Sequence, residues 1–283
     1  MHIRLSTMAE NSVSWLGLLA EWGLSILVET DNASVLVDTG RSHVAAYNSR
    51  IMKVDLTKID KIMFSHGHED HTGGLVDLLK IRDMPETPVE VIAHPEAWAT
   101  KYWRSPDGSR YNYIGIPYAR KLAESLGASF RLTMEPVWIS DRIVTSGEVP
   151  MQTDFEKIDA NAFVETGDGY IADPLRDDQS LFIVSDRGLI LVCGCAHRGI
   201  VNTIRRAQDL TGCDDVYAIV GGIHLFGASE ERLQRTIEEF KRLNIQKIGV
   251  SHCTGLYAGG VLAQEFGDRF FFNLAGTRTV FDV

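Results

Sequence analysis

Short apolar runs alternate with stretches of helical periodicity in the first half of the chain. Four of these runs predict strands: residues 24–30, 33–38, 61–65 and 89–93. The dipeptide Asp31-Asn32 between the first two runs predicts a hairpin turn. After the third run a helix is predicted, with Leu75, Leu78 and Leu79 on its apolar face. This half therefore has the pattern of an alternating α/β structure.

The second half of the chain repeats this pattern. Its predicted strands are residues 180–186, 188–193, 216–220 and 247–251, and its predicted helices are 199–210 and 230–243. In the last helix, Leu233, Ile237 and Phe240 fall on one face. Because each half has a β-rich run followed by β–α alternation, we expect two sheets packed face to face with helices outside them. The predicted fold class is thus α/β, a four-layer αββα sandwich.

The whole chain, residues 1–283, has a length that suits one large domain. Within it, residues 104–116 are rich in Arg, Gly, Ser, Tyr and Pro, which predicts a long loop. Such a loop is either a lid that closes over an anionic or aromatic substrate or a plain solvated loop. The first alternative makes Arg110 and Tyr111 substrate-binding residues, with Arg104 and Tyr113 beside them.

The composition of the chain limits which partners are expected. Apolar residues make up 45% of the chain and charged residues 23%, which is ordinary for a globular protein. The net charge of −10 disfavours nucleic acid and leaves a small-molecule substrate as the expected partner. The most apolar run, residues 13–28, is too short for a bilayer span, so no membrane association is expected. The four cysteines form no disulfide pattern, which predicts a cytoplasmic protein with reduced thiols.

The densest candidate chemistry follows the predicted strand at 61–65. His66, His68, Asp70 and His71 lie within six residues, in the segment HGHEDH. Imidazole nitrogens and carboxylate oxygens are natural ligands of transition metals: Zn²⁺ is favoured, with Fe or Mn as alternatives. On one turn, the first two histidines can reach one metal ion while the aspartate and the last histidine reach a second. The competing interpretation, a polar loop with incidental histidines, does not account for this density.

Other predicted strands also end near histidine or cysteine. In CGCAH, either Cys195 or His197 is a candidate metal ligand, and His197 is favoured because a neutral imidazole needs no deprotonation. In GGIHL, His224 is either a proton donor or substrate contact near the metals or a structural histidine. His94, in AHP, either lines the substrate pocket or caps the following helix.

These segments resemble a known family. HGHEDH matches the HxHxDH signature of the metallo-β-lactamase superfamily, and the strand that ends in Asp38 resembles its first motif. The resemblance implies a fold of the αββα type, a metal-dependent hydrolase, and a role for Asp38 in orienting the metal-binding loop. The segment SHCTG resembles the last histidine motif of the superfamily, which makes His252 a metal ligand.

One departure from the superfamily bears on the number of metal ions. Superfamily members usually have a histidine in the segment that corresponds to residues 173–180, whereas this chain has DPLRDDQS. His197 is one residue that can complete the ligand set, and Asp177 or Asp178 is the other option. The site is therefore predicted to hold one or two ions.

A narrower resemblance covers the chain from about residue 3 to its end. The segments AEWGLS, GEVP, DDQ, GCAHRGIVNT, GGIHL and HCTG resemble the 7,8-dihydropterin-6-yl-methyl-4-(β-D-ribofuranosyl)aminobenzene 5′-phosphate synthase branch. A typical motif of that branch has histidine where Trp22 stands. If this position contacts substrate, Trp22 indicates a different ligand.

Three functions follow from these patterns. The first is a metal-dependent hydrolase of a small phosphoester, ester or related metabolite, in which Asp70 orients the attacking hydroxide and His224 donates a proton to the leaving group. The second is a pterin-linked synthase, as the branch resemblance implies. The third is a non-catalytic protein of this fold that binds a metabolite, which the intact HxHxDH signature disfavours.

Overall fold

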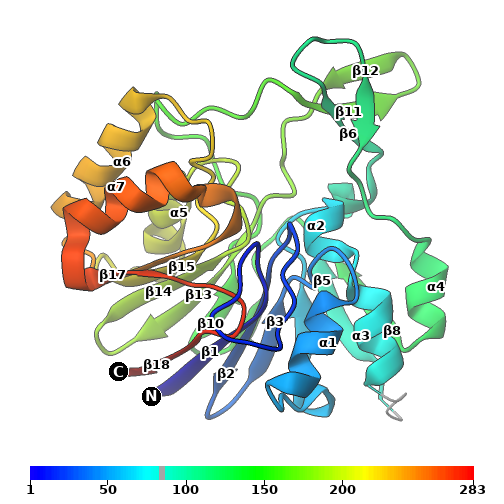
Figure 1. The fold of residues 1–283 in the computed structure, drawn as a ribbon, viewed down its shortest axis with the longest axis horizontal. Coiled ribbons are helices and arrows are strands. Elements are labelled where there is room, and N and C mark those ends of the chain that lie inside the picture. Colours follow the sequence, from blue (N-terminus) through cyan, green and yellow to red (C-terminus); the bar gives the residue numbers. More distant parts are fainter. Residues whose placement is uncertain (83–86) are drawn as a thin grey trace.

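The structure, a computed structural model, describes residues 1–82 and 87–283. Two seven-stranded sheets lie face to face, with helices on the outer face of each. Figure 1 shows α1, α3 and α4 on one side of the sandwich and α5, α6 and α7 on the other, with both termini at the same end. The predicted four-layer αββα architecture is confirmed.

The first sheet comes mostly from the first half of the chain. Its strands, in order across the sheet, are β18 (Arg278–Asp282), β1 (His2–Ala9), β2 (Ser25–Thr30), β3 (Ser34–Val37), β4 (Lys61–Met63), β5 (Val89–Ala93) and β8 (Ala128–Leu132). Its helices are α1 (Val44–Ile51), α2 (Glu69–Thr72), α3 (Leu75–Ile81) and α4 (Arg120–Ser125), with 3-10 turns η1 (Leu56–Lys58) and η2 (Pro95–Trp98). Strands β3, β4, β5 and β8 run parallel, so their carboxyl ends meet at one edge.

The second sheet is built from the second half. Its strands, in order, are β17 (Phe270–Phe272), β16 (Lys247–Val250), β15 (Val216–Gly221), β14 (Gly188–Cys193), β13 (Ser180–Ser185), β10 (Ile143–Thr145) and β9 (Trp138–Ser140). Its helices are α5 (Ile200–Thr211), α6 (Glu230–Arg242) and α7 (Leu256–Phe266), with η3 (His252–Thr254) and η4 (Gly267–Arg269). Strands β14 to β17 are parallel, which again gathers carboxyl ends at one edge.

Local sequence explains the helix that was predicted best, α6. Ser229 precedes it and accepts a hydrogen bond from the backbone N–H of Arg232, as an N-cap does. Acidic residues occupy its first turn and basic residues its last turn, which complements the helix dipole. Leu233, Ile237 and Phe240 are buried, so the apolar face predicted from the sequence is the face that packs on the sheet.

Three apolar clusters correspond to the three interfaces of the sandwich. One lies between the first sheet and its helices and includes Leu36, Phe64 and Leu78. A second lies between the other sheet and α5 to α7. The third lies between the two sheets, where Val35 and Val37 pack near residues of β13 and β14 such as Ile183 and Ile190. Fully buried strands of this kind have continuous apolar runs, which is why they could be found from sequence.

A small third sheet projects from the sandwich, and it corrects one prediction. Its strands, in order, are β12 (Gly169–Ala172), β11 (Ala162–Thr166), β6 (Lys101–Arg104) and β7 (Tyr111–Tyr113). The segment 104–116, predicted to be a long loop, is largely the hairpin between β6 and β7. Aromatic contacts stabilise it: Tyr102 and Tyr113 form a cross-strand pair, and Tyr111 stacks on Tyr170 of β12. Tyr170 and the partner strand β11 are distant in sequence from this segment, so its local composition did not indicate them.

Among the described residues, the structure has no helix that meets the length and apolarity needed to cross a bilayer. Residues 13–28, the most apolar run, form a surface loop followed by the start of β2.

Candidate metal centre

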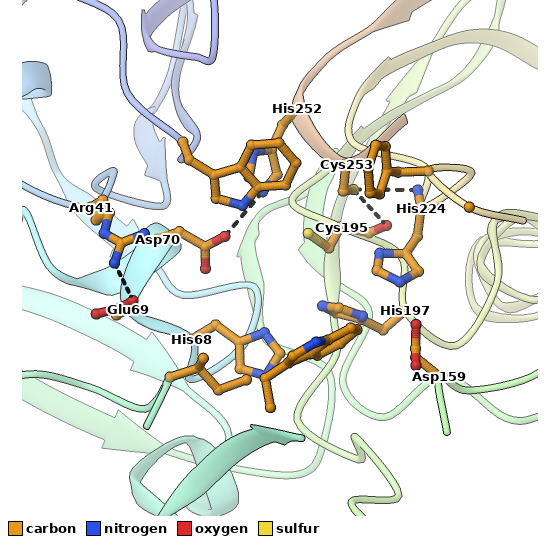
Figure 2. A pocket seen from close by; sticks show the side chains of 15 residues that line it. Arg41, His68, Glu69, Asp70, Asp159, Cys195, His197, His224, His252 and Cys253 are labelled. Atoms are coloured by element: carbon orange, nitrogen blue, oxygen red, sulfur yellow. Dashed lines mark hydrogen bonds and ion pairs between the residues drawn. The ribbon is translucent and has the colours of Figure 1, made fainter. Parts of the chain in front are cut away.

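The candidate ligands come together where the carboxyl ends of the parallel strands meet. Asp38 follows β3, His66 follows β4, and His252 follows β16. Cys195 and His197 follow β14, in the segment that leads to α5. Figure 2 shows the side chains of His68, His197, Asp70 and His252 pointing into one pocket from both halves of the molecule. His71 and His252, for example, are more than 180 residues apart in sequence, yet the sandwich brings their side chains into contact.

The first group of donor atoms consists of three imidazoles, from His66, His68 and His197. The Nε2 atom of His66 lies 2.9 Å from Nδ1 of His68 and 3.1 Å from Nε2 of His197. All three side chains are buried. Their ligand atoms lie within 4.8 Å of one another, a spacing that suits binding of a single cation.

The second group consists of Asp70, His71 and His252. The Nε2 atom of His252 lies 3.2 Å from Nε2 of His71 and 3.3 Å from Oδ2 of Asp70. These ligand atoms also lie within 4.8 Å of one another. The two groups meet in the HGHEDH segment, which contributes to both.

Cys195 and His197, which the sequence offered as alternatives, both reach the site. The Sγ atom of Cys195 lies 3.1 Å from Nε2 of His71. Its ligand atom also falls within 4.8 Å of those of His66 and His71, whereas His197 completes the three-histidine group. Cys195 therefore lies between the two groups. Burial raises the pKa of its thiol.

Tautomers test whether the histidines fit a metal ion, because a ligating nitrogen needs a free lone pair. In His66, Nδ1 lies 2.9 Å from the Ser65 hydroxyl, which itself donates to Asp38. In His71, Nδ1 lies 2.6 Å from Oδ2 of Asp38, and in His252 Nδ1 lies 2.9 Å from Oδ1 of Asn11. Each ring thus gives its Nδ1 proton to a neighbour, which leaves Nε2 for the interior of the site.

Electrostatics distinguishes the two groups. Burial holds the pKa values of His66 and His197 well below the ordinary value, and it lowers that of His68 to about 3. Burial also opposes protonation of His71, but the charges of Asp38 and Asp70 outweigh it and raise the pKa of His71 to about 9. The first group is therefore neutral at pH 7, whereas the second pairs the carboxylate of Asp70 with a protonated His71, whose proton a bound cation would replace. Both donor sets fit transition-metal ions.

Asp38 is hydrogen-bonded to residues in and next to the HGHEDH segment. Its side chain is fully buried and accepts hydrogen bonds from the backbone N–H and the hydroxyl of Ser65 and from His71. The residue adopts a positive φ of 59°, an uncommon conformation that turns its carboxylate under the HGHEDH segment. Asp38 thus contacts Ser65, just before the HGHEDH segment, and His71, at its end.

Asp177 and Asp178, the other options for completing the ligand set, have different partners. Asp177 accepts from the backbone N–H of Gly67 and from the ammonium group of Lys101. Asp178 accepts from the backbone N–H of Arg198. Neither belongs to a group of candidate metal ligands in the described residues. Of these options, His197 is the residue whose donor atom lies among the candidate ligands.

Several residues that hold the site were not predicted from the sequence. Lys101 is buried and pairs with Asp173 at 2.7 Å and with Asp177 at 3.0 Å, beneath the Gly67 turn. Glu10 accepts from the backbone N–H of His252. The acidic run at 173–178 was a signal that a buried cation should lie nearby. The position of that cation at the start of β6 was not available from the sequence.

A pocket of about 500 Å³ opens over the two donor groups. Its lining contains Trp22 and His224, as predicted for substrate contacts, and also Arg41, Trp103 and Phe226, which were not predicted. Figure 2 shows His224 beside His197, and their ring centroids lie 4.2 Å apart. His224 has a positive φ of 47° and donates its backbone N–H to the sulfur of Cys253. These contacts point its ring into the pocket.

Three predicted substrate contacts lie elsewhere. His94 caps η2 by accepting from the backbone N–H of Glu96, and its other ring nitrogen pairs with Glu148. Tyr111 stacks on Tyr170 at 4.1 Å between centroids, and Arg110 is exposed beside it. None of the three lines the pocket. The small sheet instead contributes Trp103 from β6 and the nearby Ile114.

Comparisons with known proteins identify the family of the chain. Residues 23–252 match the family model of the Metallo-beta-lactamase superfamily. The chain belongs to the metallo-β-lactamase superfamily. A curated superfamily relative from Methanocaldococcus jannaschii, 7,8-dihydropterin-6-methyl-4-(beta-D-ribofuranosyl)-aminobenzene-5'-phosphate synthase, is 30% identical over 282 residues, which cover 95% of this chain and 93% of the relative. The resemblance to the synthase branch is thereby confirmed.

Solved structures of the superfamily give the same result. Tm1679, a metal-dependent hydrolase of the beta-lactamase superfamily, aligns with a TM-score of 0.83 and 26% identity over 98% of both chains. The metallo-beta-lactamase fold protein YhfI from Bacillus subtilis aligns with a TM-score of 0.60 and 12% identity, over 98% of this chain and 99% of that one. The second similarity concerns the fold alone.

Proposed function

We propose that this chain is a metal-dependent hydrolase that acts on a small phosphoester, ester or related metabolite. One observation carries the proposal: two adjacent groups of buried donor atoms, His66/His68/His197 and Asp70/His71/His252, form the floor of a pocket of about 500 Å³. Pockets of this volume suit metabolite-sized ligands. The family, whose members are mostly hydrolases, supports the same activity.

The donor set favours Zn²⁺, with Fe or Mn as alternatives, because imidazole, thiol and carboxylate occur together. A cation bound by these residues would lower the pKa of a water molecule and polarise the substrate oxygen. His66, His68 and His197 would hold one ion, and Asp70, His71 and His252 a second. Cys195, which lies 3.1 Å from His71, would contribute to the second ion or between the two.

The protein supplies positioning and proton transfer around that chemistry. Asp70 faces His252 through Oδ2 and lies 4.0 Å from His71 through Oδ1, so it can orient a nucleophilic water and accept its proton. His224 lines the opposite part of the pocket and is the proposed donor of a proton to the leaving group. Asp38 would hold His71 in the tautomer that leaves Nε2 free.

The pocket favours a substrate that is partly apolar. Its aromatic side chains are Trp22, Trp103 and Phe226, and its one arginine, Arg41, is already paired with Glu69 at 2.6 Å. An anionic group of the substrate would therefore depend on the metal ions for charge compensation. This favours a phosphoester or carboxyl ester with an apolar part over a highly charged metabolite.

A second candidate function is a pterin-linked synthase. The observation in its favour is the relative from Methanocaldococcus jannaschii, which is a synthase by name and matches 95% of this chain at 30% identity. Against direct transfer of that activity stands Trp22, which lines the pocket at a position where the branch has histidine. A different side chain at this position of the pocket is expected to change which substrate is bound.

Metal analysis and a substrate panel test the proposal. Purified protein is expected to contain one or two equivalents of transition metal by mass spectrometry and to hydrolyse at least one of bis-p-nitrophenyl phosphate, p-nitrophenyl acetate or a thioester. Asp70→Asn should lower kcat/KM by about 10²–10⁴. Asp77→Asn, a matched change on the outer helix α3, should have no effect. Condensation of a pterin without hydrolysis would favour the synthase, and a metal-loaded protein inert to both would favour a binding protein.

A further inference from the structure

A second cavity lies beside the metal pocket. Its volume is about 300 Å³, and it shares a wall with the first pocket that consists of Trp22, Phe226 and His252. His252 belongs to the second donor group, so one side of this wall faces the metal centre and the other faces the second cavity. A ligand that occupied both cavities would cross the wall beside His252.

The wall contains large apolar groups that are exposed yet held in place. Trp22 is 47% exposed and Phe226 is 66% exposed, which is unfavourable for rings of this size unless a ligand covers them. Trp22 packs against His252 with 5.0 Å between ring centroids and meets Phe226 edge-on at 6.0 Å. The rings therefore form a corner of two aromatic surfaces at the mouth of the site.

The backbone on both sides of this corner is anchored to the metal-binding segments. Next to Trp22, the backbone N–H of Gly23 donates to Asn11, and that of Leu24 donates to the carbonyl of Asp70. Gly23 also has no room for a side chain, since a Cβ there would lie 2.6 Å from the Asp70 carbonyl oxygen. Phe226 donates its backbone N–H to the carbonyl of Cys253. Exposed rings on a rigid support lose little entropy when they bind a ligand.

The remainder of the cavity is mainly apolar in character. Phe272, Leu256, Leu274 and Val250 line it. Its polar side chains are largely used inside the protein. Glu10 accepts from backbone N–H groups of Ser12 and His252, Asn11 pairs with the ring of His252, and the hydroxyls of Ser251 and Thr254 bond to backbone groups. Because Glu10 is the acidic residue in the lining, an anionic ligand is disfavoured there.

We propose that the second cavity is a binding subsite for an uncharged, planar aromatic part of the substrate, which rests against Trp22, Phe226 and Phe272. This inference rests on the proposed hydrolase function, since it assigns the reactive group of the same substrate to the metal pocket. It identifies the substrate class as an ester or phosphoester that carries an aromatic group. Trp22 and Phe226 are then specificity-determining residues.

A binding measurement tests the subsite without any turnover. The probe is 2-naphthol, a neutral planar bicycle, titrated into metal-stripped full-length protein by calorimetry. The expected result is saturable binding at one site. Leu256→Asp, which puts a charge into the apolar lining at a position that is 83% exposed, should raise the Kd about tenfold or more. Leu16→Asp is the matched control, since Leu16 is 95% exposed and lines neither cavity.

A second measurement links the subsite to catalysis. With metal-loaded protein, p-nitrophenyl 2-naphthoate should have a higher kcat/KM than p-nitrophenyl acetate, which has the same leaving group. Leu256→Asp and Phe226→Ala should reduce that preference, and Leu16→Asp should preserve it. If naphthol binds as expected but neither ester nor phosphoester is hydrolysed, the proposed function fails while the aromatic subsite stands.

Three results would overturn the subsite: no saturable binding of 2-naphthol, equal Kd values for the wild type and Leu256→Asp, or a wild-type dimer that Leu256→Asp converts to a monomer. The last result, measured by light scattering, would assign the exposed apolar residues to an interface between two copies of the chain instead.

Discussion

The two donor groups of the candidate metal centre are neighbours, but they differ in charge and in the residues that hold them. His66, His68 and His197 are neutral at pH 7 because burial lowers their pKa values. The second group contains the carboxylate of Asp70 and a histidine, His71, whose pKa is about 9. The first group can accept a cation without losing a proton, whereas the second must exchange a proton for it. One site thus combines a pH-insensitive position with a pH-sensitive one.

The surroundings of the two groups also differ. The first group is connected to the interior, through Ser65 and Asp38 on one side and the Gly67 turn with Asp177 on the other. The second group borders the aromatic corner, because Trp22 packs on His252. We infer that the first group mainly anchors metal and that the second also adjoins the substrate.

The largest expected effect comes from removing one ligand of each group. His66→Ala and His252→Ala should each lower the metal content by about one equivalent. Each should also reduce kcat/KM by more than the 10–100-fold typical of changes to residues that only support a ligand. Metal content is measured by mass spectrometry. His2→Ala, at an exposed histidine paired with Asp282, is the control. Equal metal content in all three variants would show that these histidines do not bind metal.

The next effect concerns stability. Lys101→Met leaves Asp173 and Asp177 buried without their partner, which should lower the free energy of unfolding by about 3–5 kcal/mol. Urea unfolding of metal-stripped protein measures it. Lys61→Met removes a half-exposed pair with Glu90 and should change the free energy of unfolding by less than about 1 kcal/mol. If both variants lost a similar free energy of unfolding, the buried group of Lys101, Asp173 and Asp177 would contribute no more than the half-exposed pair.

A smaller effect is expected at Asp38. Asp38→Asn removes the charge that stabilises His71 and weakens the hold on Ser65, so metal affinity should fall about 10–100-fold. Competition with a chelator measures the metal affinity of each of the two binding steps, one for each donor group. The loss should fall mainly on the second group, because His71 bonds to Asp38 directly. An equal loss in both binding steps would remove the distinction between the groups.

The smallest effect, counted per pH unit, is the pH dependence of metal binding. His71 has a folded-state pKa raised to about 9, so below that pH a cation must displace its proton. Affinity of the second step should therefore rise up to about tenfold per pH unit from pH 7 to pH 9 and then level off. The first step should be flat in this range, since His66 and His197 are already neutral. Cobalt titration of the Cys195→Ser variant measures the metal affinity of each group without the thiol. If the affinities of both groups rose equally with pH, the proposed difference between the groups would be contradicted.

The sandwich was predictable because its strands are buried on both faces or followed by amphipathic helices. The continuous apolar runs of β13 and β14 and the spacing of Leu233, Ile237 and Phe240 are local signals. The small sheet was not predictable in the same way. It depends on the pairing of β6 with β11 and on contacts such as Tyr111 with Tyr170, which join residues far apart in sequence.

The sequence by itself determined the chemistry. HGHEDH placed four candidate ligands on one turn, Asp38 ended a predicted strand, and within a few residues after other predicted strands stood Cys195, His197, His224 and His252. Only the tertiary structure decided which of them meet. Parallel strands bring their carboxyl ends to one edge, but which side chain enters the pocket depends on local backbone conformation and packing. His224 points inward while His94 turns back to cap its own helix. For the same reason Trp103 and Phe226 line the pocket and Arg110 does not.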